Sequence, residues 1–226
     1  MDSSFVGHTL RGVSGTTTIV ALDSVSVRVG ATHILRDISL SVGQGEAVGV
    51  FGSNGAGKTT LLRMLATLIV PSAGSAHVFG SDLTSDDRYE IRPRIGYVGH
   101  VPGLYPELTL AENLGFVASA RGIGRSEVDR CLSAVGLAGA ADRRAEVCSH
   151  GMARRAEFAG VLMMEPDLLL LDEPHSALDG DAVDLVDAVV MRTMESGGAA
   201  LLVSHDKDRV RRVVTDYHEI SGGTLV

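Results

Sequence analysis

The sequence predicts an α/β fold with a parallel sheet at its core, because strand-like and helix-like patterns alternate along most of its 226 residues. Two observations carry this prediction. The apolar residues 47–51 lead into a glycine-rich loop, and a helical pattern follows over 58–69. A second apolar run, residues 168–171, ends in two acidic residues and precedes a helical pattern near 181–195.

The segments around the glycine-rich loop have the two-residue period of strands. Apolar and polar residues alternate over 18–50, and glycines mark the turns between the expected strands. Further strands are expected at 76–80 and 95–98. Residues 1–17 are rich in Ser, Thr and Gly and carry few charges, so we expect them to form a loose N-terminal tail.

A mainly helical region is expected in the middle of the chain, where apolar residues recur at helical spacing. With the loop before its first helix, this inserted region covers about residues 101–164. After the second apolar run we expect a strand at 199–203, a helix near 206–214 and a short terminal hairpin. No internal repeat is present, so residues 18–226 are expected to form a single domain.

The composition argues against two classes of interaction. The net charge is −8, and aromatic residues make up 4% of the chain, without any tryptophan. Nucleic-acid binders usually present a basic surface and aromatic stacking positions, so we expect no nucleic-acid partner. The chain has no apolar run of about 18 residues and no secretion signal, so no membrane-spanning segment is expected.

One segment matches the phosphate-binding pattern GxxxxGK[ST] and lies between an expected strand and an expected helix. Glycines let backbone N–H groups surround phosphates, and the helix N-terminus adds its dipole. Lys58 is expected to reach the β- and γ-phosphates, and Thr59 to bind Mg²⁺. A chance match in a glycine-rich turn would leave the flanking strand and helix unexplained. The residues predicted to bind nucleotide here are Gly52, Ser53, Asn54, Gly55, Ala56, Gly57, Lys58, Thr59 and Thr60.

An acidic pair, Asp172 and Glu173, follows the second apolar run. Acids at the carboxyl end of a buried strand lie beside the phosphate loop in folds of this kind. Asp172 is expected to hold Mg²⁺, and Glu173 to polarise the water that attacks the γ-phosphate. A helix N-cap after a core strand would explain one acid but not both.

Phosphate loops occur in many families, and three further motifs distinguish this chain. Ser149-His150-Gly151-Met152, followed by Arg155, precedes the acidic pair. Ser176-Ala177-Leu178-Asp179 follows that pair, and Ser204-His205-Asp206 follows the apolar segment 199–203. In this order the motifs resemble the signature, the D-loop and the switch histidine of ABC transporter ATPases.

This resemblance covers about residues 18–226 and implies a phosphate-loop NTPase fold of the ABC type. That fold has a parallel sheet core, an N-terminal antiparallel β subdomain and an inserted helical subdomain. The implied cofactors are ATP and Mg²⁺. Two subunits, in a homodimer or a heterodimer, would pack head to tail around ATP. The implied partner is an integral membrane permease, so this chain would lie peripherally on the cytoplasmic face of the cell membrane.

The resemblance also assigns roles to individual residues. Ser149 and Gly151 would complete the γ-phosphate site of the opposite subunit, and the helix that follows them would point its N-terminus at the anion. Glu173, His205 and Lys58 would be the catalytic residues, with His205 in contact with the γ-phosphate.

The chain departs from the family pattern at three places. His100 stands where a glutamine is usual, and an imidazole can bind Mg²⁺ or accept from a metal-bound water. The signature has His150 and Met152 in place of the usual Gly and Gln. Val29 occupies the position expected to stack on adenine, where an aromatic residue is usual.

Residues 97–114 resemble the corresponding segment of the haem-exporter ATPases of cytochrome c maturation. The signature form Ser-His-Gly-Met also occurs in drug and lipid exporter ATPases, which are an alternative. A soluble ABC ATPase acting on DNA or ribosomes would need a long coiled coil or a second cassette, and neither is present. A phosphate-loop kinase would leave residues 149–152 and His205 unexplained. The permease is expected to contact a groove near residues 100–107. Phe116 is expected either to line this groove or to lie in the core.

Overall fold

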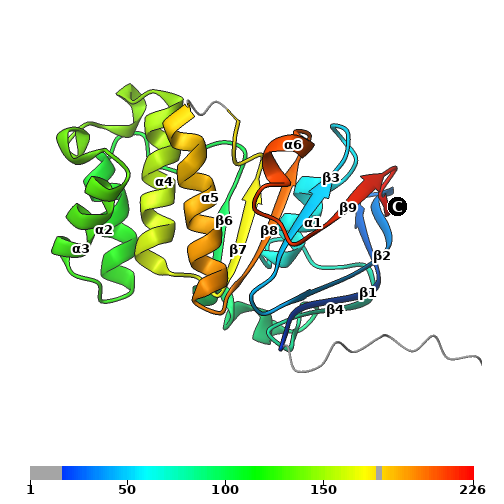
Figure 1. Ribbon diagram of the computed structural model, residues 1–226. Helices are drawn as coiled ribbons and strands as arrows, with labels where there is room; N and C mark the ends of the chain where they lie inside the picture. Colours follow the sequence, from blue (N-terminus) through cyan, green and yellow to red (C-terminus); the bar gives the residue numbers. More distant parts are fainter. Residues whose placement is uncertain (1–16, 177–179) are drawn as a thin grey trace, which may run out of the picture.

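A parallel sheet is the centre of the fold in the computed structural model, which describes residues 17–176 and 180–226 (Figure 1). Within these residues its six strands lie in the order β10-β9-β3-β8-β7-β6. Neighbouring strands from β9 to β6 are parallel, and β10 is antiparallel to β9, so the expected parallel core is confirmed. The strands are β3 (Ala47–Phe51), β6 (Ile95–Val98), β7 (Leu168–Asp172), β8 (Ala199–Ser204), β9 (Asp216–Ser221) and β10 (Thr224–Leu225).

A second sheet is antiparallel, and its strands come from the N-terminal part of the chain, as the ABC-type fold implies (Figure 1). Its order is β2-β1-β4-β5, and Val29 pairs with Thr32 across the turn that joins β1 to β2. Gly30 in this turn has a φ of 60°, which a residue with a side chain adopts at a cost. Its strands are β1 (Thr18–Val29), β2 (Thr32–Gly43), β4 (Ala73–Val78) and β5 (Ser81–Asp82).

Helices cover both faces of the parallel sheet. Helix α1 (Lys58–Leu65) lies between the two sheets, and its leucines belong to the apolar core that the sheets share. Helix α5 (Gly180–Glu195) and the short α6 (Lys207–Val210) pack on the opposite face, in a second apolar core. Apolar burial on both faces explains why β3, β7 and β8 are continuous apolar runs.

Two helices are shorter than the sequence pattern predicts. Helix α1 ends at Leu65 rather than near residue 69, because Thr67 has a φ of 61° and Arg92 donates to both its hydroxyl and its carbonyl oxygen. Helix α6 ends at Val210 rather than near 214, because the chain must turn to enter β9. The Thr215 N–H donates to the Ala47 carbonyl and starts this pairing beside β3.

The expected helical region lies between β6 and β7 in the chain and has an apolar core of its own. It contains α2 (Leu110–Ala120), α3 (Arg125–Ala134) and α4 (His150–Met164), which stand together at one side of the sheet (Figure 1). A capping box between Thr109 and Glu112 fixes the start of α2. Short 3₁₀ turns occupy Ala138–Ala140 and Ala145–Val147 within this region, and Asp86–Tyr89 and Arg92–Arg94 before β6.

Two sequence expectations concern residues outside this description. The expected loose tail lies outside it except for Thr17, and Ala177, Leu178 and Asp179 of the D-loop also lie outside it. Within the described part of the chain, no helix combines the length and the apolar character needed to cross a lipid bilayer.

Candidate nucleotide site

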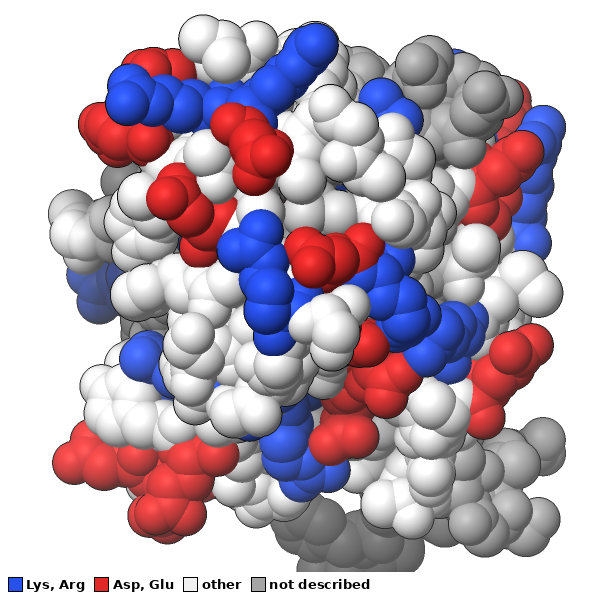
Figure 2. All heavy atoms as spheres, turned by 90° about the vertical axis from the view of Figure 1, so that its left-hand side faces the viewer, with Lys and Arg blue, Asp and Glu red and all other residues white. Residues whose placement is uncertain are grey.

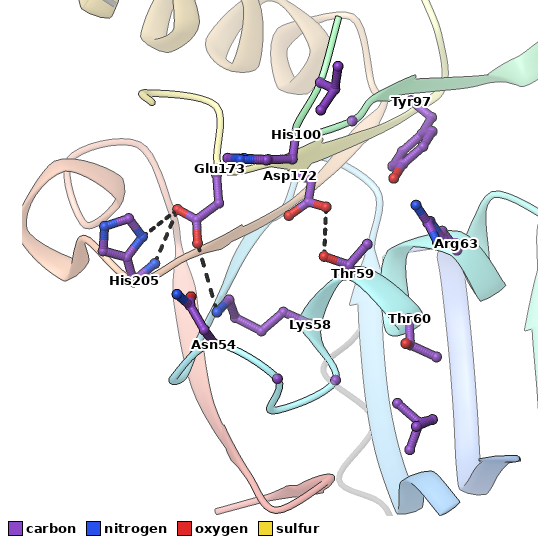
Figure 3. A pocket seen from close by; sticks show the side chains of 15 residues that line it. Asn54, Lys58, Thr59, Thr60, Arg63, Tyr97, His100, Asp172, Glu173 and His205 are labelled. Atoms are coloured by element: carbon purple, nitrogen blue, oxygen red, sulfur yellow. Dashed lines mark hydrogen bonds and ion pairs between the residues drawn. The ribbon is translucent and has the colours of Figure 1, made fainter. Parts of the chain in front are cut away.

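The site lies where three neighbouring strands end at the same edge of the parallel sheet. Strands β3 and β7 both flank β8, so the segments after these strands come together. They border a cleft of about 820 Å³ (Figure 3). The cleft is lined by Ile34, Asn54, Gly55, Gly57, Lys58, Thr59, Thr60, Arg63, Tyr97, Gly99, His100, Val101, Asp172, Glu173 and His205.

The loop between β3 and α1 wraps closely around the Lys58 side chain. The Lys58 ammonium donates to the carbonyl oxygens of Gly52 at 2.7 Å and Ser53 at 3.2 Å, and the residue is only 6% exposed. A Cβ at Gly57 would lie 2.6 Å from a Leu35 methyl group, and Gly57 has a φ of 109°. The loop therefore depends on a residue without a side chain at this position, which lets its backbone approach an anion closely.

The first acid, Asp172, ends β7 and is buried at 2% exposure. Its Oδ2 accepts a hydrogen bond of 2.8 Å from the Thr59 hydroxyl (Figure 3). A hydroxyl and a carboxylate are hard oxygen ligands, which suit Mg²⁺ when phosphates and waters supply the remaining positions. Among the described residues no group of three or more His, Cys, Asp and Glu side chains could hold a metal by itself.

The second acid, Glu173, is held by the end of β8. Its Oε2 accepts from the Ser204 hydroxyl at 2.9 Å. The same oxygen accepts from the His205 backbone N–H at 3.3 Å and lies 2.9 Å from His205 Nδ1 (Figure 3). Its Oε1 lies 3.8 Å from the Lys58 ammonium. Glu173 has a φ of 50°, an uncommon value for a residue with a side chain. The carboxylate therefore has a fixed position beside the phosphate loop.

The structure separates the remaining predicted residues into two groups. His100 lines the cleft, opposite the phosphate loop (Figure 3). Val29 is 58% exposed and does not line it, whereas Ile34 on β2 does. Ser149 and Gly151 also lie outside the lining of this cleft, at the start of α4, where the Ser149 hydroxyl accepts from the Met152 N–H at 3.2 Å.

Sequence reasoning did not single out Ile34, Arg63, Tyr97 or Ser204. Ser204 was quoted only as part of a motif, although its place directly after a buried strand is the signal that also marks Asp172. Tyr97 and Arg63 project into the cleft from β6 and α1 (Figure 3). Burial raises the pKa of the Tyr97 phenol above its ordinary value, so the phenol is neutral and can donate a hydrogen bond.

A phosphate loop, an acidic pair and a histidine at the carboxyl edge of a parallel sheet define a nucleotide-binding domain of the phosphate-loop class. Comparison with known families makes this class specific, because the model of a family described as "ABC transporter" matches residues 35–176. The chain belongs to the ABC transporter family, and the domain that it forms is an ABC ATPase domain.

Relatives with different named functions resemble the chain. It is 43% identical over 184 residues to the aliphatic sulfonates import ATP-binding protein SsuB 2 of Burkholderia cenocepacia (strain HI2424), a match that covers 79% of this chain and 65% of that protein. It is 36% identical over 189 residues to the cytochrome c biogenesis ATP-binding export protein CcmA of Cupriavidus necator (strain ATCC 17699), with 83% of each chain covered. The chain thus spans slightly less than two thirds of the length of its sulfonate-import relative.

A solved structure has the same fold. The protein whose title reads "dimeric structure of a post-hydrolysis state of the ATP-binding cassette MJ0796 bound to ADP and Pi" superposes with a TM-score of 0.80 at 26% identity. The match covers 91% of this chain and 96% of that one.

Replacing the held carboxylate is expected to stop turnover. We predict that Glu173→Gln lowers the kcat for ATP hydrolysis by about 10²- to 10⁴-fold, the usual contribution of a general base, because an amide cannot take a proton from water. The dissociation constant for ATP should stay within about threefold of the wild-type value, since the phosphate contacts are unchanged. Single-turnover hydrolysis and equilibrium nucleotide binding would measure the two quantities. Wild-type turnover in this variant would exclude Glu173 as the base.

An aromatic side chain at position 29 is expected to strengthen nucleotide binding, because the family resemblance predicts that residue 29 faces the base. In a Glu173→Gln background, Val29→Tyr should bind ATP at least about fivefold more tightly, because stacking on a base contributes roughly 1–3 kcal/mol. Ile34→Ala is the matched control at the aliphatic position that lines the cleft, and it should weaken binding of ATP and GTP alike. Equal ATP affinities for Val29→Tyr and its parent would place residue 29 away from the base.

Proposed function

We propose that this chain binds and hydrolyses Mg-ATP and drives transport through a separate membrane permease. The observation that carries the proposal is the position of the Glu173 carboxylate, which Ser204 and His205 hold 3.8 Å from the phosphate-loop lysine. A general base must lie within reach of a water at the γ-phosphate, and the position of this carboxylate beside the phosphate-loop lysine supports that role.

The residues would divide the work as follows. Lys58 would exchange its hydrogen bonds to the Gly52 and Ser53 carbonyl oxygens for the β- and γ-phosphates. Thr59 and Asp172 would hold Mg²⁺, which would neutralise the charge that develops on the phosphates. Glu173 would accept the proton of the attacking water, and His205, which already touches that carboxylate, would keep it in place and contact the γ-phosphate.

A second subunit would complete the nucleotide site. Ser149 and Gly151 lie at the N-terminus of α4, outside the lining of their own cleft, so they are available to the nucleotide of another subunit. Similarity to a protein described as dimeric with ADP and Pi supports this arrangement. We therefore infer a head-to-tail dimer, with either an identical or a related subunit.

An exposed apolar area beside β6 and α2 is the surface that a permease would contact. Tyr105 and Phe116 form an edge-to-face pair with ring centroids 5.8 Å apart, and they are 55% and 62% exposed. Val101 is 73% exposed in the same loop. Phe116, which the sequence left between core and surface, is thus on the surface. Docking there would place the chain peripherally at the cytoplasmic face of the cell membrane.

Figure 2, which views the molecule from the left-hand side of Figure 1, gives no support for a nucleic-acid surface on this face. Acidic and basic side chains are interspersed there, and nucleic-acid binders gather basic side chains into a patch.

Export is the direction we propose, with haem for cytochrome c biogenesis as the candidate substrate. Residues 97–114 support it, as does the match to the CcmA export protein over 83% of both chains. Import is the second candidate, because identity to the sulfonate import protein is higher, at 43%. Export of a drug or lipid is the third candidate, from the signature form Ser-His-Gly-Met.

ATP is expected to control the state of assembly. The Glu173→Gln variant should be monomeric without nucleotide and dimeric in Mg-ATP, because the shared ligand persists when it is not hydrolysed. Multi-angle light scattering at several protein concentrations measures this change, with ADP as the control nucleotide. A dimer that is equally stable without ATP would contradict assembly around the nucleotide.

Transport direction can be tested with a membrane protein that copurifies with this chain. Inside-out membrane vesicles that contain both proteins should accumulate haem when ATP is added, and vesicles with Glu173→Gln should not. Uptake of an alkanesulfonate by right-side-out vesicles with internal ATP, without haem accumulation in the inverted ones, would replace export by import.

A further inference from the structure

A buried arginine connects α4 to the loop that carries His100. Arg154 is 0% exposed, and its guanidinium donates to two consecutive carbonyl oxygens, those of Gly99 at 2.5 Å and His100 at 2.7 Å. These carbonyls follow β6 directly. The two hydrogen bonds use the planar fork of the guanidinium, a geometry that a lysine cannot reproduce.

A glutamate on the same helix holds the other end of this loop. Glu157 Oε2 lies 3.1 Å from Arg154 Nη1, and Glu157 Oε1 accepts from the Gly103 N–H at 2.8 Å. The Glu157 side chain is 11% exposed. One ion pair on α4 therefore fixes the segment Gly99–Gly103 at both ends.

Burial makes this ion pair expensive. Burial lowers the pKa of Arg154 and raises the pKa of Glu157, so both shifts oppose the charged forms. A buried ion pair of this kind is by itself a weak contributor to stability. Its hydrogen bonds to the loop backbone, in contrast, define where that loop lies relative to α4.

The fixed loop lies between the nucleotide cleft, a second groove and α4. Gly99, His100 and Val101 line the nucleotide cleft. Gly103 and Glu157 both line a second groove of about 200 Å³. Helix α4 begins immediately after Ser149, the residue expected to contact the nucleotide of the other subunit.

We propose that Arg154 and Glu157 are positioning residues that join the His100 loop to α4, so that the loop and the Ser149 end of the helix move as one body when nucleotide binds. This inference rests on the proposed function, since it concerns ATP hydrolysis between two subunits. Loss of the link would leave each subunit able to bind nucleotide but unable to present Ser149 and Gly151 correctly to its partner.

The test uses Arg154→Lys, Arg154→Gln and Glu157→Gln in the full chain. We expect the kcat for ATP hydrolysis to fall about 10- to 100-fold in each, the range that a small misplacement in an active site can cause. The dissociation constant for ADP should change by less than about threefold. The double variant should lose no more than the worse single variant, because both act through one link.

Assembly separates this role from a merely structural one. In the Glu173→Gln background, Arg154→Lys and Arg154→Gln should bind ATP but fail to form the dimer by light scattering. Arg192→Gln is the matched control, because it removes an exposed ion pair with Glu165 at the other end of α4, and it should dimerise normally. Arg154→Lys retains the positive charge but not the planar guanidinium. It therefore tests the pair of hydrogen bonds to the loop even if Arg154→Gln fails to fold.

Two results would overturn the proposal: normal kcat in a folded Arg154→Lys protein, or normal ATP-driven dimerisation of either Arg154 variant in the Glu173→Gln background. The proposed function would fail differently. In that case the wild-type chain itself would neither hydrolyse ATP nor assemble in the Glu173→Gln form, whatever residue stood at 154.

Discussion

The parallel pairing of β3, β8 and β7 is the constraint on which the rest of the structure depends. It brings three chain segments, far apart in sequence, to one edge of a sheet whose faces are both buried. The phosphate loop follows β3, the acidic pair follows β7, and Ser204 and His205 follow β8. Any slip in this pairing would move Glu173 away from Lys58, and their present 3.8 Å contact would be lost.

Buried charge is the second organising feature. Lys58 and Asp172 are almost fully buried, and each has a hydrogen-bond partner, the first in the loop backbone and the second in Thr59. Groups of this kind are tolerated because each charge is compensated locally. Lys58 can exchange its hydrogen bonds to the loop for contacts with phosphates, because phosphates are stronger partners for an ammonium group than carbonyl oxygens are. The site is thus built to exchange internal contacts for a ligand.

The helical region also contains buried charged groups that have hydrogen-bond partners, those of Arg154 and Glu157. Helices α2, α3 and α4 have their own apolar core, and Phe158 and Val161 of α4 also pack in the core between the parallel sheet and α5. Arg154 and Glu157 add a polar connection, because they hydrogen-bond to the loop after β6. Directional hydrogen bonds of this kind define the position of the loop relative to α4 more narrowly than apolar contacts alone.

Sequence patterns predicted most of the fold, because periodicity and glycine positions record which residues are buried. The strands around Phe51, Asp172 and Ser204 lie where the apolar runs placed them. Helix ends were less well predicted, since the left-handed backbone at Thr67 and its contacts with Arg92 depend on a distant segment. Ile34 was not predicted to line the cleft for a similar reason, because no local sequence pattern distinguishes it.

The sequence by itself determined the class of chemistry, because the phosphate loop and the acidic pair are local patterns whose spacing follows from one strand, one turn and one helix. Only the tertiary structure decided what Glu173 touches, that Ile34 rather than Val29 lines the cleft, and that Arg154 reaches the His100 loop. These contacts join residues from different elements, and they depend on how sheets and helices pack. A contact between side chains that are far apart in the sequence produces no periodic pattern in the sequence.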